Sequence, residues 1–160
     1  MKPTEKTNVM RLLEQKKIPY ESFTYEADPT KTGEEIASML GESPDLVFKT
    51  LVTQGKSGEH YVFVIPVNTE LDLKLAAKTV SEKSVSMLKQ KELLPLTGYV
   101  HGGCSPIGMK KFFKTTFHET MAQLDHIYFS AGKVGYQVKV TPKDLEKIIR
   151  FQTADIIIHV

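Results

Sequence analysis

The strongest constraint on the fold of this chain is a pair of β-rich runs joined by a short segment that contains two glycines. The runs cover residues 46–54 and 61–67, and the joining segment covers residues 55–60. Their content of Val, Ile, Phe, Tyr and Thr is typical of strands, and a short glycine-containing connection lets consecutive strands pair side by side. The sequence therefore predicts a β-hairpin whose second strand ends at Pro66.

Lys49 interrupts the first run, which otherwise contains the apolar side chains of a buried strand. A cation there needs a reason, and two glycine-bearing segments downstream, 102–108 and 130–135, could supply one. Glycines remove side chains where a ligand must approach the backbone, and they leave N–H groups free to bind an anion or a carbonyl oxygen. Together the three features indicate a pocket for an anionic ligand. The alternative is a lysine at a sheet edge with its ammonium in water, and glycines that only form turns.

Helical and extended patterns alternate along the rest of the chain. Helices are expected over residues 4–17, 32–40, 72–80 and 89–94 and after residue 141, and strands over residues 20–25, 126–130, 136–140 and 154–158. Thr32 and Thr141 are the expected N-terminal caps of two of these helices. The pattern predicts an α/β fold, in which one compact domain over residues 1–160 has a strongly curved mixed sheet with helices outside it.

The composition excludes several classes of protein. A chain of 160 residues with 41% hydrophobic content can bury a core without a metal or a disulfide, and the single cysteine rules out an internal disulfide and a multi-cysteine metal site. No apolar run approaches membrane-spanning length and the N-terminus is charged, so we expect a cytoplasmic protein without a membrane partner. The net charge of +2 is too small to coat nucleic acid by charge alone, so DNA is not an expected partner and any RNA contact must be local.

Cys104 is the residue that a search for a nucleophile would select, since His101 precedes it and Ser105 follows it. A cysteine hydrolase needs a thiolate and a base within hydrogen-bond reach, which adjacency in the sequence does not establish. A lone cysteine in a small domain is more often a small buried hydrophobe. We therefore favour a packing role for Cys104.

A group of histidines and carboxylates could suggest a metal site. His118 and His126 bracket Glu119 and Asp125, but their spacing fits no standard set of metal ligands. The sequence therefore favours surface polar residues, and no metal or cofactor is expected.

A basic segment later in the chain has two interpretations of equal weight. Lys110, Lys111 and Lys114 flank Phe112 and Phe113. The lysines could meet RNA phosphates while the aromatic rings pack beneath them, or the segment could be a solvated basic turn.

Five segments of the chain resemble, in one order, the bacterial YbaK/EbsC family. These segments are residues 24–28, 47–51, 71–74, 97–111 and 130–135. The family consists of stand-alone editing domains that deacylate cysteinyl-tRNA(Pro), so the resemblance implies the same activity here. It also implies a barrel-like α/β fold, related to the editing insertion of bacterial prolyl-tRNA synthetases. The pocket of this fold receives the 3′-terminal adenosine of the tRNA with its attached amino acid.

The resemblance also implies roles for single residues. The family's essential lysine falls on Lys49, where a cation can hold phosphates at the 3′ end of the tRNA. The substrate-binding positions that match are Tyr25, Lys49, Thr50, Gly102, Gly103, Ser105, Ser130 and Gly132. Among them, Lys49, Gly103 and Ser130 are expected to serve the reaction, and a branched side chain at Gly103 is expected to block the pocket. Two positions depart from the family pattern: Ala131 replaces a frequent glycine, and Gln137 replaces a frequent aspartate.

The leading hypothesis is therefore a trans-editing enzyme that removes cysteine from tRNA(Pro), with prolyl-tRNA synthetase as a candidate partner. None of the matched segments offers an activated nucleophile, and the resemblance implies that the thiol of the attached cysteine attacks its own ester. Two alternatives stay open. One is a deacylase of the same fold that acts on another small amino acid, such as alanine, and the other is a module that binds a nucleotide or the tRNA 3′ end without chemistry.

Overall fold

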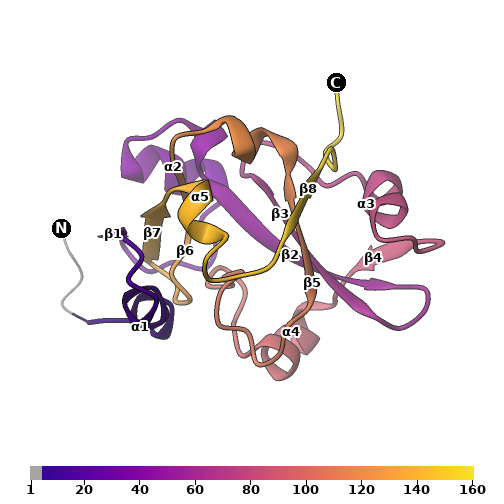
Figure 1. Ribbon diagram of the computed structural model, residues 1–160, viewed down its shortest axis with the longest axis horizontal. Coiled ribbons are helices and arrows are strands. Elements are labelled where there is room, and N and C mark those ends of the chain that lie inside the picture. The colour runs from indigo at the N-terminus through magenta and orange to yellow at the C-terminus, as the bar shows by residue number, and fades with distance from the viewer. Residues whose placement is uncertain (1–4) are drawn as a thin grey trace.

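The computed structural model describes residues 5–160 and has the expected α/β architecture, with mixed pairing of strands and helices packed around them (Figure 1). The strands are β1 (Glu21–Thr24), β2 (Phe48–Gly55), β3 (His60–Pro66), β4 (Val85–Met87), β5 (Lys114–His118), β6 (Ile127–Ser130), β7 (Tyr136–Val140) and β8 (Gln152–Ala154). The helices are α1 (Asn8–Gln15), α2 (Gly33–Leu40), α3 (Leu73–Thr79), α4 (Gln90–Thr97) and α5 (Pro142–Leu145), with the short 3-10 helices η1 (Pro44–Leu46) and η2 (Glu119–Gln123). Within the described chain, none of these helices has the length and apolar character needed to cross a membrane.

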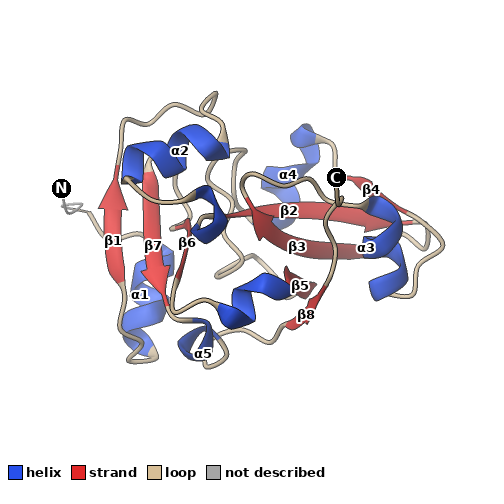
Figure 2. Ribbon diagram, turned by 90° about the horizontal axis from the view of Figure 1, so that it is seen from above, coloured by secondary structure: helices blue, strands red, loops and turns tan. Residues whose placement is uncertain are grey.

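The strands form two sheets, one of three strands in the order β1-β7-β6 and one of five strands in the order β4-β2-β3-β5-β8. The expected hairpin is present, since β2 and β3 pair antiparallel along their length. β5 joins β3 in parallel and β8 joins β5 in parallel, so the larger sheet is mixed. Figure 2 shows the two long strands of the hairpin extending from the three-stranded sheet toward α3 and β4.

The hairpin separates two apolar cores, because the side chains of β3 alternate between its faces. Val62 and Val64 belong to the larger core, against which Leu93 of α4 packs. Phe63 lies in the second core together with Ala76 of α3. Helices α3 and α4 therefore cover opposite faces of the five-stranded sheet.

The two sheets meet at a parallel bridge between Val47 and Tyr128. On the same side of β2, pairing with β4 begins only at Thr53. Between these points, residues 48–51 have β3 on one side and no strand on the other, as far as the described chain goes. This open edge of β2, defined by residues 48–51, determines where the candidate site lies.

Two helix starts follow the sequence expectation in detail. Thr32 and Glu35 form a reciprocal capping box at the start of α2, and Gly41 ends this helix in the left-handed conformation. Thr141 caps α5, with Pro142 in the first turn.

Two other helices differ from the expected bounds. The first helix begins at Asn8, after its cap Thr7, whereas residues 1–4, where its start was predicted, lie outside the described residues. Helix α4 continues to Thr97, beyond the predicted end at Leu94, although it contains Pro95. Pro95 is itself exposed and lies in the last turn of the helix, where its missing N–H removes only one intrahelical hydrogen bond.

Strand β5 is the main element that the pattern did not predict, and the short strand β4 was also missed. Residues 115–118 of β5 are all buried, because the strand lies between β3 and β8 inside the sheet. A strand buried on both faces has no polar and apolar alternation, and its threonines and histidine conceal it further. The predicted last strand, 154–158, is also displaced, since β8 ends at Ala154 and only Ile157 makes a further bridge, to Leu71.

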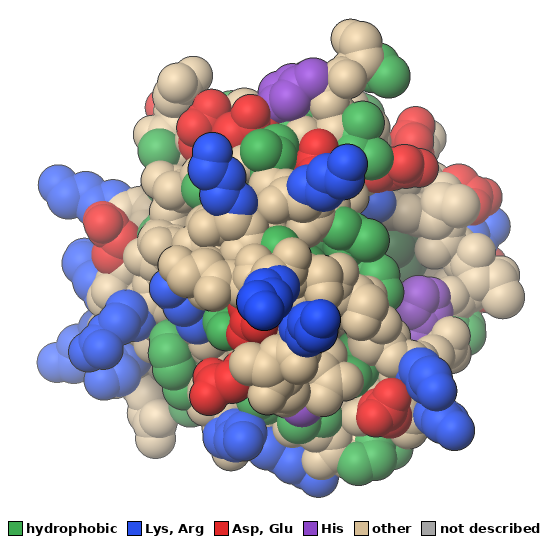
Figure 3. Space-filling view, turned by 90° about the vertical axis from the view of Figure 1, so that its right-hand side faces the viewer, with side chains coloured by type: hydrophobic (Ala, Val, Ile, Leu, Met, Phe, Trp, Pro, Cys, Tyr) green, Lys and Arg blue, Asp and Glu red, His purple; other side chains and the backbone are tan. Residues whose placement is uncertain are grey.

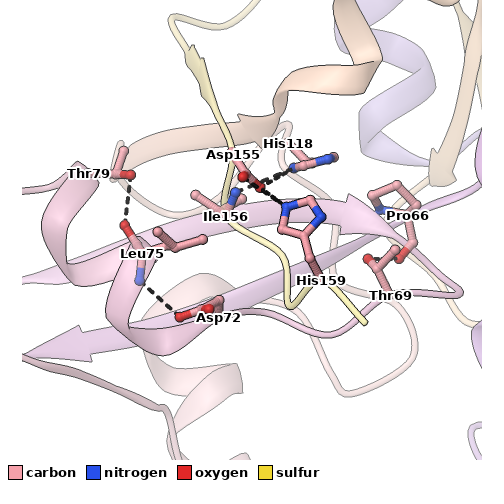
Figure 4. Close-up of polar contacts among 9 residues, drawn as sticks. All are labelled: Pro66, Thr69, Asp72, Leu75, Thr79, His118, Asp155, Ile156 and His159. Carbon is pink, nitrogen blue, oxygen red and sulfur yellow. Dashed lines mark hydrogen bonds and ion pairs between the residues drawn. The ribbon is translucent and has the colours of Figure 1, made fainter.

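The C-terminal segment is held by polar contacts that involve a buried histidine (Figure 4). His118 was expected at the surface, but it is only 2% exposed, and its Nδ1 accepts a hydrogen bond from the Ile156 N–H at 3.4 Å. Burial lowers the pKa of His118, although the charge of Asp155 opposes this shift. The imidazole is therefore neutral near pH 7, as an acceptor at Nδ1 requires. His159 contacts both carboxylate oxygens of Asp155 at 2.8 Å.

Candidate functional site

A cavity of about 440 Å³ lies along the open edge of β2, which is within the size range of small-molecule sites. It is lined by Lys31, Thr32, Gly33, Glu34, Ile36, Val47, Phe48, Lys49, Thr50, Leu51, Val67, Leu93, His101, Gly102, Cys104, Ser130 and Gln137. The wall therefore contains parts of all three sequence features that indicated a pocket, namely Lys49 and both glycine-bearing segments. The lining residues carry two lysines and one carboxylate.

Lys49 is half-buried at this edge, and its ammonium forms no hydrogen bond or ion pair within residues 5–160. Burial lowers the pKa of Lys49, and the charges of Glu70 and Glu34, which lie beyond ion-pair distance, oppose this shift. A partly buried cation without a contact partner is unfavourable. The arrangement is typical of a site where the partner is an anionic group of a ligand.

Three buried polar atoms near the cavity also have no hydrogen-bond partner in the described part of the chain: Thr50 Oγ1, Gln137 Oε1 and the Tyr25 hydroxyl. Thr50 and Gln137 line the cavity, and Gln137 is only 4% exposed. Tyr25 is not among the lining residues. Burial raises the pKa of its hydroxyl, and the nearby Gln137 side chain and Gly135 backbone oppose part of this shift. The Tyr25 hydroxyl and Gln137 Oε1 nevertheless have no hydrogen-bond partner in the described chain. Because buried polar atoms are nearly always paired, these three favour a ligand with polar groups of its own.

The opposite wall offers a hydroxyl and backbone donors. Ser130, at the end of β6, accepts a hydrogen bond at Oγ from the Gly132 N–H at 3.1 Å, which leaves its own hydroxyl proton free to donate. The N–H groups of Gly102 and Cys104, both in the cavity wall, form no hydrogen bond within residues 5–160. By contrast, the Gly103 N–H donates to the Val100 carbonyl at 3.0 Å.

Besides Tyr25, three predicted residues are not in the cavity wall, namely Gly103, Ser105 and Gly132. Ser105 is fully buried and accepts the Ile107 N–H at 3.3 Å, so it stabilises a turn. Gly132 has a positive φ of 91°, and a Cβ at this position would lie 3.0 Å from Tyr99. The structure gives these residues turn and packing roles, and their contact with a ligand stays a prediction.

Gly103 lies where the two glycine-bearing segments touch. A Cβ there would be 2.9 Å from the backbone nitrogen of Val134 and 3.2 Å from the carbonyl carbon of Lys133. A valine would therefore meet the backbone of the other segment, rather than fill the cavity as expected from the sequence. The close approach of the two segments sets the position of the wall that carries Gly102 and Ser130.

We expect Gly103→Val to lower the free energy of unfolding by about 1–3 kcal/mol, because backbone atoms cannot move aside as a side chain can. Urea denaturation followed by circular dichroism measures the change. Ala122→Val also introduces a branched side chain, at an exposed position, and should change the free energy much less. Equal stability of Gly103→Val and the wild type would show that the segments separate without cost.

Cys104 lines the cavity but has the properties of a packed thiol. It is buried, and burial raises its pKa to about 12. A thiol with this pKa is almost entirely protonated near pH 7, so it lacks the thiolate that a nucleophile needs. The geometry therefore supports the packing role that the sequence favoured.

Sequence patterns missed one wall of the cavity. The start of α2 contributes Lys31, Thr32 and Glu34, and α4 contributes Leu93. Thr32 was recognised as a helix cap, which was the available signal, but a cap does not reveal what its helix faces. Among the described residues there is no group of three or more His, Cys, Asp or Glu placed to hold a metal ion.

The two departures from the expected pattern differ in their position. Ala131 is fully buried, and its N–H donates to the Tyr136 carbonyl at 3.0 Å, so its methyl group is accommodated in the core. Gln137 lies in the cavity wall with an unpaired Oε1. Of the two, Gln137 is therefore the one placed to influence what the cavity binds.

Comparison with known proteins gives the same family for most of the chain. Residues 27–148 match the family described as the aminoacyl-tRNA editing domain. A protein of Enterococcus faecalis named as a Cys-tRNA(Pro)/Cys-tRNA(Cys) deacylase, EbsC, is 44% identical over 156 residues, which cover 97% of this chain and 95% of that protein.

Solved structures with low sequence identity share the fold. One, described as a trans-editing enzyme for prolyl-tRNA synthetase, has a TM-score of 0.81 and 23% identity and covers 97% of this chain and 100% of that one. Another, of a hypothetical protein, has a TM-score of 0.85 and 22% identity and covers 95% of this chain and 100% of that one.

Proposed function

Because the chain belongs to the aminoacyl-tRNA editing domain family and is of the YbaK/EbsC type, we propose that it is a trans-editing deacylase that removes cysteine from mischarged tRNA(Pro). The observation that carries the proposal is Lys49, a partly buried ammonium without a contact partner at the edge of a cavity. An aminoacyl-tRNA 3′ end brings to such a cavity a phosphate, ribose hydroxyls and an amino acid.

The polar groups of the cavity suit this ligand. The ammonium of Lys49 meets a phosphate of the terminal nucleotide, since phosphate contacts fix register and orientation on a nucleic acid. The unpaired Thr50 and Gln137 oxygens accept hydrogen bonds from hydroxyl or amino groups of the substrate. The ester that links the amino acid to the ribose then lies toward Ser130 and Gly102.

The reaction that fits these groups uses the substrate's own thiol. The sulfur of the attached cysteine attacks the ester carbonyl carbon and forms a C–S bond. The bond from that carbon to the ribose oxygen then breaks, and the thiol proton reaches the ribose oxygen through solvent. The products are a cysteine thiolactone and free tRNA, and one water molecule later opens the thiolactone to cysteine.

The protein contributes positioning and charge stabilisation. An intramolecular attack in the right geometry can be worth about 7–11 kcal/mol of the barrier. Negative charge develops on the carbonyl oxygen, and the Ser130 hydroxyl and the unpaired N–H groups of Gly102 and Cys104 are donors available to it. Gly103 serves indirectly in this scheme, because its own N–H is occupied and its packing positions the wall.

A second candidate is a deacylase for another small amino acid, such as alanine, on tRNA(Pro), because Gln137 changes the charge of the cavity wall relative to the family pattern. This neutral side chain occupies the cavity wall where the family often has an aspartate, so the pocket lacks one negative charge. Release rates from tRNA(Pro) charged with cysteine, alanine or proline distinguish the candidates. Fastest release of cysteine supports the proposal, and fastest release of alanine supports the second candidate. Binding of all three without release identifies a binding module.

We expect Cys104→Ser to keep the cysteine release rate within about twofold of the wild type, because this thiol is protonated and takes no covalent part. Single-turnover release of radiolabelled cysteine measures the effect. The variant must first show the wild-type circular dichroism spectrum, since Cys104 is buried. If the folded variant no longer releases cysteine, the result would instead support a cysteine hydrolase with Cys104 as its nucleophile.

A further inference from the structure

One segment of the chain has a charge balance unlike the rest. Residues 87–118 contain five lysines, Lys89, Lys91, Lys110, Lys111 and Lys114, and one carboxylate, Glu92. The whole chain has 21 basic and 19 acidic residues, so the remainder has 16 basic and 18 acidic ones. The positive charge of this protein is thus concentrated in about a fifth of its length.

The fold places three of these lysines at the two ends of α4. Lys89 and Lys91 lie at the start of the helix. Lys110 lies at its other end, where its N–H donates to the Thr97 carbonyl at 3.0 Å and its Nζ donates to the Pro95 carbonyl at 3.2 Å. All five lysines are exposed, and none forms an ion pair within residues 5–160. Their charge is therefore available to a partner.

Apolar side chains are exposed among the lysines. Phe112 is 62% exposed, Leu94 52%, Val100 48% and Met87 46%, which makes half of the eight large apolar residues that are exposed in the described chain. We call the five lysines and these four residues the α4 surface. Figure 3 views the molecule from the end that carries α3 and β4; blue side chains are visible along its lower margin, the side where α4 lies in Figure 1, and also at its left margin and centre.

Two residues of the α4 surface are neighbours in the sequence of residues in the cavity wall. Leu93, which precedes the exposed Leu94, is in the cavity wall, and so is His101, which follows the exposed Val100. A strand of nucleic acid that enters the cavity with its last nucleotide must leave across a neighbouring surface. Among the described residues, the α4 surface adjoins the cavity and carries both unpaired cations and an exposed aromatic ring.

We propose that the α4 surface binds the single-stranded 3′ end and the adjoining acceptor-stem phosphates of the tRNA. This inference rests on the proposed function, which places the terminal adenosine in the cavity. The lysines meet backbone phosphates, and the ring of Phe112 stacks on an unpaired base, a combination that single-stranded nucleic acid sites use. Charge complementarity favours RNA over an apolar protein face, because none of the five lysines has an ion-pair partner in the described chain.

The test compares two triple variants. Lys89→Ala/Lys91→Ala/Lys111→Ala removes three charges from the α4 surface, and Lys74→Ala/Lys78→Ala/Lys83→Ala removes three exposed charges from α3 and the segment after it, on the other face of the sheet. Binding of tRNA(Pro) without an attached amino acid is measured between 50 and 200 mM KCl. We expect the first variant to bind about tenfold more weakly, with a salt slope smaller by about 2–3. The matched control should stay within twofold of the wild type.

A small substrate separates this inference from the proposed function. Cysteinyl-AMP, the 3′-cysteinyl ester of adenosine 5′-phosphate, keeps the phosphate that Lys49 is proposed to bind and lacks the rest of the tRNA. The first triple variant should lose about tenfold in kcat/KM on Cys-tRNA(Pro) and nothing on cysteinyl-AMP. If the wild type cleaves neither substrate, the proposed function is wrong. The binding measurement with tRNA(Pro) still tests whether the α4 surface binds RNA.

Two results would overturn the inference. One is that the first triple variant binds tRNA with the affinity and salt slope of the wild type, or that the control variant loses as much affinity as the first. The other is a concentration-dependent dimer of the wild type, seen by light scattering, that Phe112→Ala abolishes while tRNA binding is unchanged. The latter would assign the surface to a second copy of the chain.

Discussion

Lys49→Ala should reduce kcat/KM for cysteine release from Cys-tRNA(Pro) by about 100-fold, which corresponds to the loss of one strong charge-assisted hydrogen bond. The side chain forms no ion pair or hydrogen bond within the described chain, and burial lowers its pKa. Its removal should therefore leave folding nearly unchanged while it deprives the substrate phosphate of its cation. Release of radiolabelled cysteine at limiting tRNA measures the loss.

Two comparisons interpret this result. Lys49→Arg keeps a cation at the open edge of β2 and should recover part of the activity. Lys56→Ala removes an exposed lysine from the turn of the same hairpin and should stay within twofold of the wild type. If Lys49→Ala retains wild-type turnover, the phosphate of the substrate binds elsewhere.

The second large effect concerns the substrate. Cysteine should be released from tRNA(Pro) at least about 100-fold faster than serine, because a thiol is a few per cent thiolate near neutral pH, whereas a hydroxyl is almost never ionised. The two amino acids have nearly the same shape, so binding alone does not separate them. The single-turnover rate constants of both charged tRNAs, measured with saturating protein, give the ratio directly.

Methylation of the nucleophilic sulfur provides the matching control. tRNA(Pro) charged with S-methylcysteine keeps the sulfur but lacks the thiol proton and the thiolate, so its release should fall to the rate of serine. Equal release of cysteine and serine would mean that a water molecule, rather than the substrate thiol, attacks the ester.

The sequence predicted the hairpin and singled out Lys49 within its first strand. Strand residues on both sides of a short glycine-containing turn leave few alternatives to antiparallel pairing. A lysine inside such a strand is conspicuous, because burial of its charge is unfavourable. The two glycine-bearing segments were also evident from the sequence, the resemblance assigned them substrate-binding roles, and the cavity wall contains Lys49, Gly102 and Ser130 together.

The parts of the fold and of the candidate site that the sequence did not predict depend on tertiary packing. Strand β5 is buried on both faces, so its threonines and His118 gave no alternating pattern. The start of α2 lines the cavity beside the part of β2 that β4 leaves unpaired. The roles of Gly103 and Gly132 were also hidden, since a sequence shows that a glycine is present but not which backbone or ring it approaches.

The most direct test of the central claim is the rate at which this protein releases radiolabelled cysteine from Cys-tRNA(Pro) under single-turnover conditions, with Lys49→Ala and buffer as parallel samples. Our account predicts release far above the buffer rate with the wild type, and release about 100-fold slower with the variant. A wild-type rate equal to that of buffer, in a protein that nevertheless binds the charged tRNA, would contradict it and leave a binding module.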